Sequence, residues 1–177
     1  MDASSYVVRA PALADAAALG RVHCAVWQAT YAEVMDPAAY AALSPARFEA
    51  GWRRRLERDV GEGGEATGPG PLGEVTRIAE HRSGQIVGFM SVGPARDADP
   101  PAGLQLWSLN LVPEHQGTGL ADRLMSEVLG GGPAYLWVAR GNARAIRFYQ
   151  RHEFALDGAE IFDGHDGITE VRMVRRG

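Results

Sequence analysis

Apolar residues change their spacing along the chain, and these changes predict the secondary structure. Residues 5–11 (SYVVRAP) are rich in β-branched and aromatic side chains, which predicts a short first strand that ends at a proline. Residues 12–35 carry apolar side chains at helical spacing, which predicts a long amphipathic helix. A short helix is expected after Asp36 and Pro37. A longer one is expected over residues 44–59, where a serine N-cap precedes a proline at the first helical position.

Strand-like runs dominate the second half of the chain. Residues 74–92 contain two such runs around a Ser-Gly turn, which predicts an antiparallel hairpin. Residues 104–112 predict a further strand, and its irregular alternation over residues 108–111 indicates a β-bulge. After a loop with two glycines, a helix, a strand, a helix and two strands are predicted over residues 120–129, 134–139, 142–152, 154–162 and 167–176.

The order of these elements is that of one α/β domain. The segment GEGGEATGPGPLG at residues 61–73 breaks the periodicity. We interpret it as a surface loop, because neither side of it alone forms a complete α/β unit. The length of 177 residues is usual for a single domain. We therefore expect one domain over residues 1–177.

Composition excludes several classes of chemistry. The net charge of −4 at pH 7 disfavours a nucleic-acid binder, because affinity for a phosphate backbone comes from clustered cations. The chain has no lysine, so mechanisms that need a lysine Schiff base or a P-loop lysine are excluded. The single cysteine, Cys24, excludes an intramolecular disulfide and a cysteine-based zinc site.

The sequence favours a cytoplasmic protein. A single cysteine fits a reducing compartment. No run of about 18 apolar residues is present, and the first residues lack the charged and apolar regions of a signal peptide. We therefore expect a cytoplasmic location, with neither a membrane nor a nucleic acid as partner.

The segment LVPEHQGTGLADRLM, residues 111–125, joins a strand to a helix through two glycines. The first N–H groups of a helix have no partner within it, and the helix dipole adds positive potential there. Because glycine lets an anion approach the backbone closely, two interpretations are open, a tight turn or a phosphate-binding site. Residues 116–121 fit the pattern Q/R-x-x-G-x-G/A, but neither a P-loop nor a dinucleotide fingerprint.

Two motifs of the chain resemble those of the GCN5-related N-acetyltransferases. LVPEHQGTGLADRLM is similar to motif A of this family, and LWVARGNARAIRFYQRHEFALDG, residues 136–158, is similar to motif B. VHCAVWQATYAEVM, residues 22–35, resembles the first-helix region, and EVRMVRR, residues 170–176, resembles the last strand. The resemblance covers nearly the whole chain, and residues 61–73 are the part least like the family.

The resemblance implies both a fold and an activity. The fold would be α/β (α+β) in three layers, with a mixed, mostly antiparallel central sheet of about six to seven strands. Helices would flank the sheet, and the strands would splay at a slot for the cofactor. The activity would be transfer of an acetyl group from acetyl-CoA to a primary amine of a small molecule or a peptide N-terminus, by direct attack in a ternary complex. A homodimer is open, since dimers are common in the family.

The resemblance also assigns residues to the binding of acetyl-CoA. In the family, the main-chain amides of motif A hold the pyrophosphate, and the preceding strand pairs with the pantetheine amides. Carried over to this sequence, the pyrophosphate residues are Gln116, Gly117, Thr118, Gly119, Leu120 and Ala121, and the strand residues are Asn110, Leu111 and Val112.

Two residues of motif B have both an implied role and a structural alternative. Asn142 matches an asparagine that contacts the pantetheine arm, or it is simply the N-cap of a helix, and one side chain can do only part of both. Tyr149 matches a tyrosine near the CoA sulfur, where a phenol can act as the catalytic acid that protonates the leaving thiolate. Its alternative is a half-buried aromatic residue with a satisfied hydroxyl.

The acceptor side is less defined. Trp27 and Tyr31 are one helical turn apart and share a face, in a region that flanks the acceptor pocket in the family. We expect them to contact a small, cationic amine, and core packing of both rings is the alternative. The general base is not identified, since Glu33, His23, Glu114 and a chain of water molecules are all candidates.

No metal is expected, because the five histidines show no metal-binding spacing such as H-E-x-x-H. Two other functions remain open. One is a non-catalytic acyl-CoA-binding or regulatory module of the same fold, and the other is a nucleotide-binding regulator.

Overall fold

Within residues 5–59, 73–164 and 166–177, which the structure describes, seven strands form one sheet. They are β1 (Tyr6–Arg9), β2 (Val75–His81), β3 (Ile86–Pro94), β4 (Leu104–Leu111), β5 (Ala134–Ala139), β6 (Ala155–Asp163) and β7 (Ile168–Arg175). The strand order in this computed structural model is β1-β2-β3-β4-β5-β7-β6. Neighbours are antiparallel except β4 and β5, which are parallel. The predicted surface loop at residues 61–73 falls outside the described residues except for Gly73.

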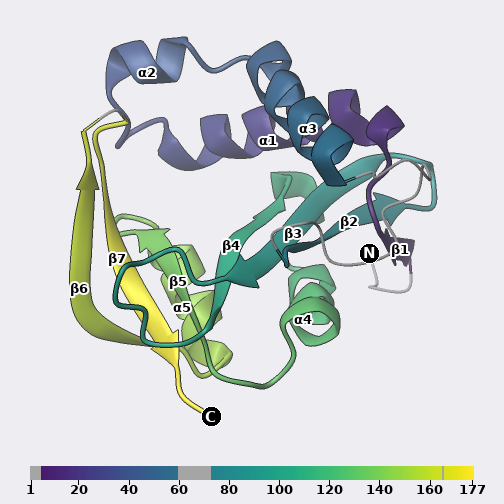
Figure 1. Ribbon diagram of the computed structural model, residues 1–177. Helices are drawn as coiled ribbons and strands as arrows, with labels where there is room; N and C mark the ends of the chain where they lie inside the picture. The colour runs from purple at the N-terminus through teal and green to yellow at the C-terminus, as the bar shows by residue number, and fades with distance from the viewer. Residues whose placement is uncertain (1–4, 60–72, 165) are drawn as a thin grey trace.

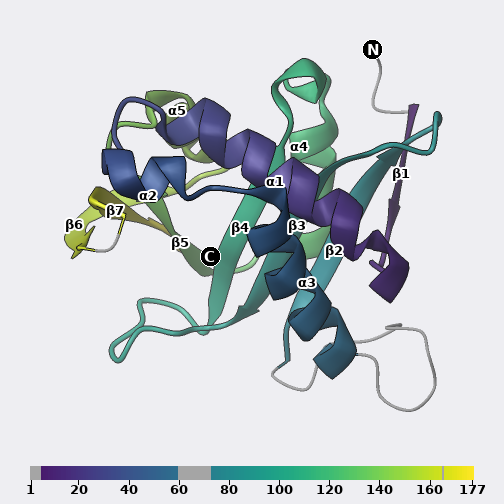
Figure 2. The ribbon, with the colours of Figure 1, turned by 90° about the horizontal axis from the view of Figure 1, so that it is seen from above.

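Helices cover both faces of the sheet and make three layers (Figures 1 and 2). They are α1 (Ala16–Tyr31), α2 (Pro37–Ala41), α3 (Pro45–Asp59), α4 (Leu120–Leu124) and α5 (Ala143–Arg151), with 3-10 turns η2 (Leu13–Asp15) and η3 (Pro113–His115) and a π-helix η4 (Met125–Leu129). Figure 1 shows α1, α2 and α3 over one face and α4 and α5 on the other. The predicted mixed, mostly antiparallel sheet flanked by helices is confirmed.

Side-chain caps set where two of the helices begin. Asp36 accepts hydrogen bonds from two main-chain N–H groups at the start of α2, and Ser44 accepts one at the start of α3. Both predicted starts are therefore confirmed. The long helix predicted over residues 12–35 is shorter in the structure, because a 3-10 turn precedes it and the helix ends at Tyr31.

A β-bulge interrupts the pairing of β3 with β4. Ser91 lies opposite Ser108 and Val92 lies opposite Leu106, so Trp107 is left as the extra residue. The predicted bulge is present, but it lies one residue before the range expected from the sequence. A bulge bends the strand and re-aims the side chains around it. Here it brings both Trp107 and Ser108 to the wall of the large cavity described below.

The sheet splits between its two parallel strands. Gln105 of β4 pairs with Tyr135 of β5, Leu106 pairs with Leu136, and the pairing ends there. From that point β4 stays paired with β3 as far as Leu111, whereas β5 stays paired with β7. The splay predicted from the resemblance is therefore confirmed.

Apolar packing on both faces holds the central strands in place. Leu19 of α1 and Leu56 of α3 are buried on one face, and Leu120 and Leu124 of α4 are buried on the other. Each is at most 1% exposed. Since complete burial of a leucine contributes roughly 1.5–3 kcal/mol, these contacts fix β3 and β4 between the two helix layers.

The close approach of β3 to β4 requires a glycine at position 88, which gives the first prediction. A Cβ on Gly88 would lie 2.2 Å from Leu111 Cδ2 and 2.5 Å from the main-chain oxygen of Asn110. We predict that Gly88→Ala lowers the free energy of unfolding by about 1–3 kcal/mol, because β4 must move away. Chemical denaturation measures this loss. Gly103→Ala is the matched control, since a Cβ there meets open space, and an equal loss in both variants would contradict the account.

Candidate active site

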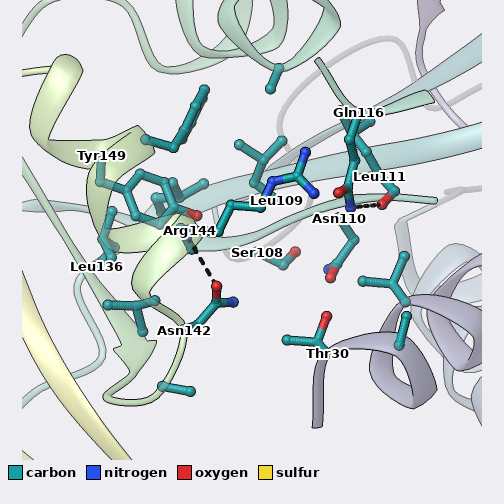
Figure 3. Close-up of a pocket in the computed structure, with 18 of the residues that line it drawn as sticks. Thr30, Ser108, Leu109, Asn110, Leu111, Gln116, Leu136, Asn142, Arg144 and Tyr149 are labelled. Carbon is teal, nitrogen blue, oxygen red and sulfur yellow. Dashed lines mark hydrogen bonds between the residues drawn. The ribbon is translucent and has the colours of Figure 1, made fainter. Parts of the chain in front are cut away.

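The splay opens into one large cavity of about 1030 Å³ (Figure 3). Its walls come from α1 on one face of the sheet, from the turn before α4 and from α5 on the other face, and from β4, β5 and β7 between them. Figure 3 shows Tyr149, Asn142, Ser108 and Asn110 around the same space. The cavity therefore joins the two faces of the sheet through the gap between β4 and β5.

The turn before α4 has the geometry of an anion-binding site. Gly117 and Gly119 have φ angles of +75° and +81°, in the left-handed region that favours glycine. Gly119 is the N-cap of α4, and because it has no side chain, no side-chain cap closes the first turn. The Thr118 hydroxyl turns away and donates to the His115 main-chain oxygen at 2.9 Å. The first N–H groups of the helix are thus available to an anion, and the residues present fit a diphosphate.

Most of the residues assigned to the cofactor line this cavity. Those that do are Asn110, Leu111, Gln116, Gly117, Gly119, Ala121, Asn142 and Tyr149. Gln116 is held in place by its side-chain amide, which donates to the Leu111 main-chain oxygen at 2.8 Å. Leu120 is instead fully buried in the core, so only its main chain can face a ligand.

The main chain of Val112 was expected to pair with the pantetheine, but in the structure it is bonded within the chain. Its N–H donates to the Val87 oxygen at 3.0 Å, and its own oxygen accepts from the His115 N–H at 3.0 Å. Both main-chain groups are therefore engaged within the chain. Of the three predicted strand residues, Asn110 and Leu111 are the two that line the cavity.

Asn142 is the N-cap of α5, which was the alternative to its expected role in cofactor binding. Its Oδ1 accepts a hydrogen bond from the Ala145 N–H at 3.0 Å (dashed in Figure 3). No hydrogen bond to another described residue engages its Nδ2 group. The two roles are therefore compatible, because the cap uses the oxygen and leaves the NH₂ group to the cavity that the residue lines.

Tyr149 is more buried than the half-buried aromatic residue that was the alternative to its catalytic role. The residue is 8% exposed, and Figure 3 shows its ring and hydroxyl at the wall of the cavity. Among the described residues, no hydrogen bond to the hydroxyl is found. Burial raises the pKa of Tyr149 well above its usual value, with a smaller contribution from Tyr31. The phenol is therefore neutral at physiological pH and has a proton to donate.

Trp27 and Tyr31 share a face of α1, as predicted, and both line the cavity. Their ring centroids are 5.2 Å apart in an edge-to-face arrangement. Trp27 also packs on Phe48 of α3, with centroids 5.5 Å apart. Both residues are partly buried and pack against the core, as the alternative predicted, and their contact with the acceptor stays a prediction.

The three residues considered for the general base differ in whether they line the cavity. His23 lines the cavity, whereas Glu33 and Glu114 are exposed and lie outside its wall. The His23 ring packs against Phe48 at 4.2 Å. Burial, followed by the charge of Arg55, lowers the pKa of His23 to about 4. His23 is therefore neutral at physiological pH and a weak base.

The sequence analysis assigned no role to six further polar residues of the cavity wall: Thr30, Ser108, Asp122, Arg144, Arg151 and Glu170. Arg144 lies in the first turn of α5, two residues beyond its cap, and Figure 3 shows its guanidinium extended across the cavity. Helical spacing could have placed Thr30 beside Trp27. Nothing local to the sequence could have placed Glu170 here, since β7 enters the sheet between β5 and β6.

Two kinds of feature are absent from the described part of the chain. No group of three or more His, Cys, Asp or Glu residues in it is arranged to hold a metal ion. None of its helices is long and apolar enough to cross a membrane.

The model of the acetyltransferase (GNAT) family matches residues 27–154, which is more than half of the chain. The chain belongs to this family. A probable N-acetyltransferase of Mycobacterium tuberculosis is 26% identical over 163 residues, 89% of this acetyltransferase and 84% of the relative. YuaI of Bacillus subtilis, an uncharacterized N-acetyltransferase, is 26% identical over 151 residues, 82% of this chain and 78% of the relative.

A solved structure has the same fold. The PaiA N-acetyltransferase of Thermoplasma acidophilum, in complex with coenzyme A, superimposes with a TM-score of 0.70. The match covers 98% of this acetyltransferase and 99% of that chain, at 18% identity. The likeness supports the fold, and the family match identifies the protein as an acetyltransferase enzyme. The resemblance found in motifs A and B is therefore confirmed.

The two roles of Asn142 can be separated by substitution. We predict that Asn142→Asp keeps the cap, so its free energy of unfolding stays within about 0.5 kcal/mol of the original, whereas Asn142→Ala loses about 1 kcal/mol. Both variants lack the NH₂ donor, so both should bind coenzyme A about tenfold more weakly. Denaturation and calorimetry measure the two quantities. Undiminished coenzyme A affinity in Asn142→Asp would limit Asn142 to capping.

Proposed function

We propose that the acetyltransferase transfers an acetyl group from acetyl-CoA to a primary amine of a small molecule or a peptide N-terminus, by direct attack in a ternary complex. The observation that carries this proposal is the cavity that passes through the splay. The expected cofactor residues of the α4 turn and α5 line it together with the expected acceptor residues of α1. Donor and acceptor can therefore meet within one cavity, and no covalent enzyme intermediate is needed.

The α4 side of the cavity binds the cofactor in this proposal. Main-chain N–H groups around Gly117 and Gly119 hold the pyrophosphate, and Arg144 adds a positive charge from α5. The main chain of Leu111 and the Nδ2 group of Asn142 contact the pantetheine, whereas the main-chain groups of Asn110 face Phe89 of β3. Acetyl-CoA, when bound, supplies the activated thioester.

Tyr149 is the catalytic acid in this proposal. Loss of the thiol leaves negative charge on sulfur, and a neutral phenol can protonate or hydrogen-bond that sulfur. The buried position of Tyr149 at the cavity wall and its hydroxyl without a partner among the described residues support this role. Trp27 and Tyr31 form the acceptor wall on the opposite side.

Family membership favours catalysis over a non-catalytic acyl-CoA-binding module or a nucleotide-binding regulator. A thiol-release assay over a varied panel of primary amines tests the proposal directly, with calorimetry of coenzyme A binding in parallel. Turnover with at least one amine supports it. Tight binding of coenzyme A with no turnover over the whole panel would support the non-catalytic module instead. Displacement of coenzyme A by a nucleotide would support the regulator.

Substitution of the proposed acid should affect the chemical step and little else. We predict that Tyr149→Phe lowers kcat about 100-fold and changes the acetyl-CoA KM by less than about twofold, because the proton is donated mainly in the transition state. Tyr40→Phe is the control, since the Tyr40 hydroxyl contacts the Gln28 main-chain oxygen outside the cavity. Steady-state kinetics measure both variants. Unchanged kcat in Tyr149→Phe would exclude the acid role.

Arg144 gives a prediction about cofactor affinity. Loss of a charge-assisted hydrogen bond to a phosphate costs about 1.5–3 kcal/mol, so Arg144→Ala should weaken coenzyme A binding by roughly tenfold or more. The loss should shrink at high salt, because the contact is electrostatic. Arg147→Ala is the matched control on the same helix, as its exposed side chain lies outside the cavity wall. Equal calorimetric affinities for the two variants would contradict the assignment.

A further inference from the structure

Glu170 places a carboxylate in the cavity wall, and no cation of the described residues pairs with it. It lies on β7, directly opposite Ala139 of β5, and it is half-buried. Among the described residues, no ion pair or hydrogen bond to its carboxylate is found. Neighbouring carboxylates of the same part of the sheet are paired, since Asp157 contacts Arg172 at 2.8 Å and Glu160 contacts Arg140. A half-buried carboxylate that no cation of the described residues neutralises is available to pair with a cationic ligand in the cavity.

The surroundings of Glu170 favour a positive charge. Among the described residues, the titratable groups that interact electrostatically with Glu170 are Tyr31 from α1, Asp163 from β6 and Asp166 from the turn before β7. None of the three is a cation. Burial raises the pKa of Glu170 above its usual value, and the charges of Asp163 and Asp166 raise it further. A cation bound here would relieve this repulsion, whereas an anion would increase it.

A second observation ties Glu170 to the reacting end of the cavity. Tyr149 is more than nine-tenths buried, and its hydroxyl has no partner among the described residues. The wall of the cavity therefore contains a hydroxyl that is able to hydrogen-bond a ligand. Tyr31 is the electrostatic neighbour of both residues. Glu170 raises the pKa of Tyr31, after burial, and Tyr31 in turn raises that of Tyr149. The carboxylate, the aromatic wall and the proposed acid therefore occupy one region.

We propose that the Glu170 carboxylate binds the ammonium group of the amine acceptor. Tyr31 and Trp27, whose rings are 5.2 Å apart, border the bound cation. The acidic surroundings then select amines that carry no carboxylate next to the amino group. This inference rests on the proposed function and adds to it a substrate class, the cationic amines as opposed to amino acids.

The role of Glu170 also has a consequence for stability. Its raised pKa means that the folded chain binds a proton more tightly than the unfolded chain does. The stability linked to this group is therefore present at low pH and is lost as pH rises through the raised pKa. At pH 7 the ionised carboxylate destabilises the fold, so Glu170→Gln should raise the melting temperature or leave it unchanged. A purely structural Glu170 would give a lower melting temperature.

Calorimetry with two matched pairs of probes tests the proposal. The pairs are butylamine with norvaline and phenethylamine with phenylalanine, titrated into the complex with coenzyme A at pH 7.5. We expect at least one amine to bind about tenfold or more tightly than its amino acid. Glu170→Gln should bind that amine at least about tenfold more weakly. Glu160→Gln, the same change of charge on the neighbouring strand outside the cavity wall, should remain within about twofold.

The pH dependence supplies an independent readout. As pH falls through the raised pKa of Glu170, the affinity of the original chain for the amine should fall, because the carboxylate must be ionised to bind an ammonium group. Glu170→Gln should show no such fall. Equal affinities for amine and amino acid, equal losses in both variants, no binding of any probe, or a lower melting temperature for Glu170→Gln would each overturn the proposal.

Failure of this inference can be told apart from failure of the proposed function. Coenzyme A binding and thiol release over the amine panel are measured on the same samples. If both persist while the probe pairs show no preference and Glu170→Gln behaves like Glu160→Gln, only the inference about Glu170 fails. If coenzyme A does not bind, the proposed function fails with it.

Discussion

The loss of pairing between β4 and β5 after Leu106 and Leu136 is the constraint on which the rest of the structure depends. Where parallel strands separate, their main-chain N–H and C=O groups lose their partners in the sheet. Such groups need other hydrogen-bond partners, from side chains, water or a ligand. The fold prevents the gap from closing, since β3 holds β4 along its length and β7 holds β5 over six residue pairs. The cavity is therefore built into the topology of the sheet, and side chains from both helix layers reach it.

The turn before α4 and the start of α5 face this gap with complementary groups. Gly117 and Gly119 turn the chain in the left-handed region and leave the first N–H groups of α4 uncapped. Asn142 caps α5 with its oxygen and keeps its NH₂ group for the cavity. On the opposite side, Tyr31 and Glu170 add an aromatic ring and a carboxylate. The cavity therefore has a side suited to a phosphate and a side suited to an amine.

Features set by neighbouring residues could be predicted from the sequence, whereas those set by distant contacts could not. The caps at Ser44 and Asn142 are local, and both are in place. The bulge at Trp107 depends on the register of β3, so its position was missed by one residue. Glu170 reaches the cavity only because β7 lies beside β5, more than 30 residues away in sequence. The splay itself was predicted through family resemblance and not from periodicity.

The central claim is that the uncapped turn before α4 holds the pyrophosphate of the cofactor in the splay. The most direct test is a titration of the ¹⁵N-labelled protein with coenzyme A, followed by amide NMR. The account predicts that the largest shifts fall on the amides of Gly117, Gly119, Leu120 and Ala121, with smaller ones at Asn110 and Leu111 on β4. Saturable binding that leaves these signals unmoved, with the shifts elsewhere in the molecule, would contradict it.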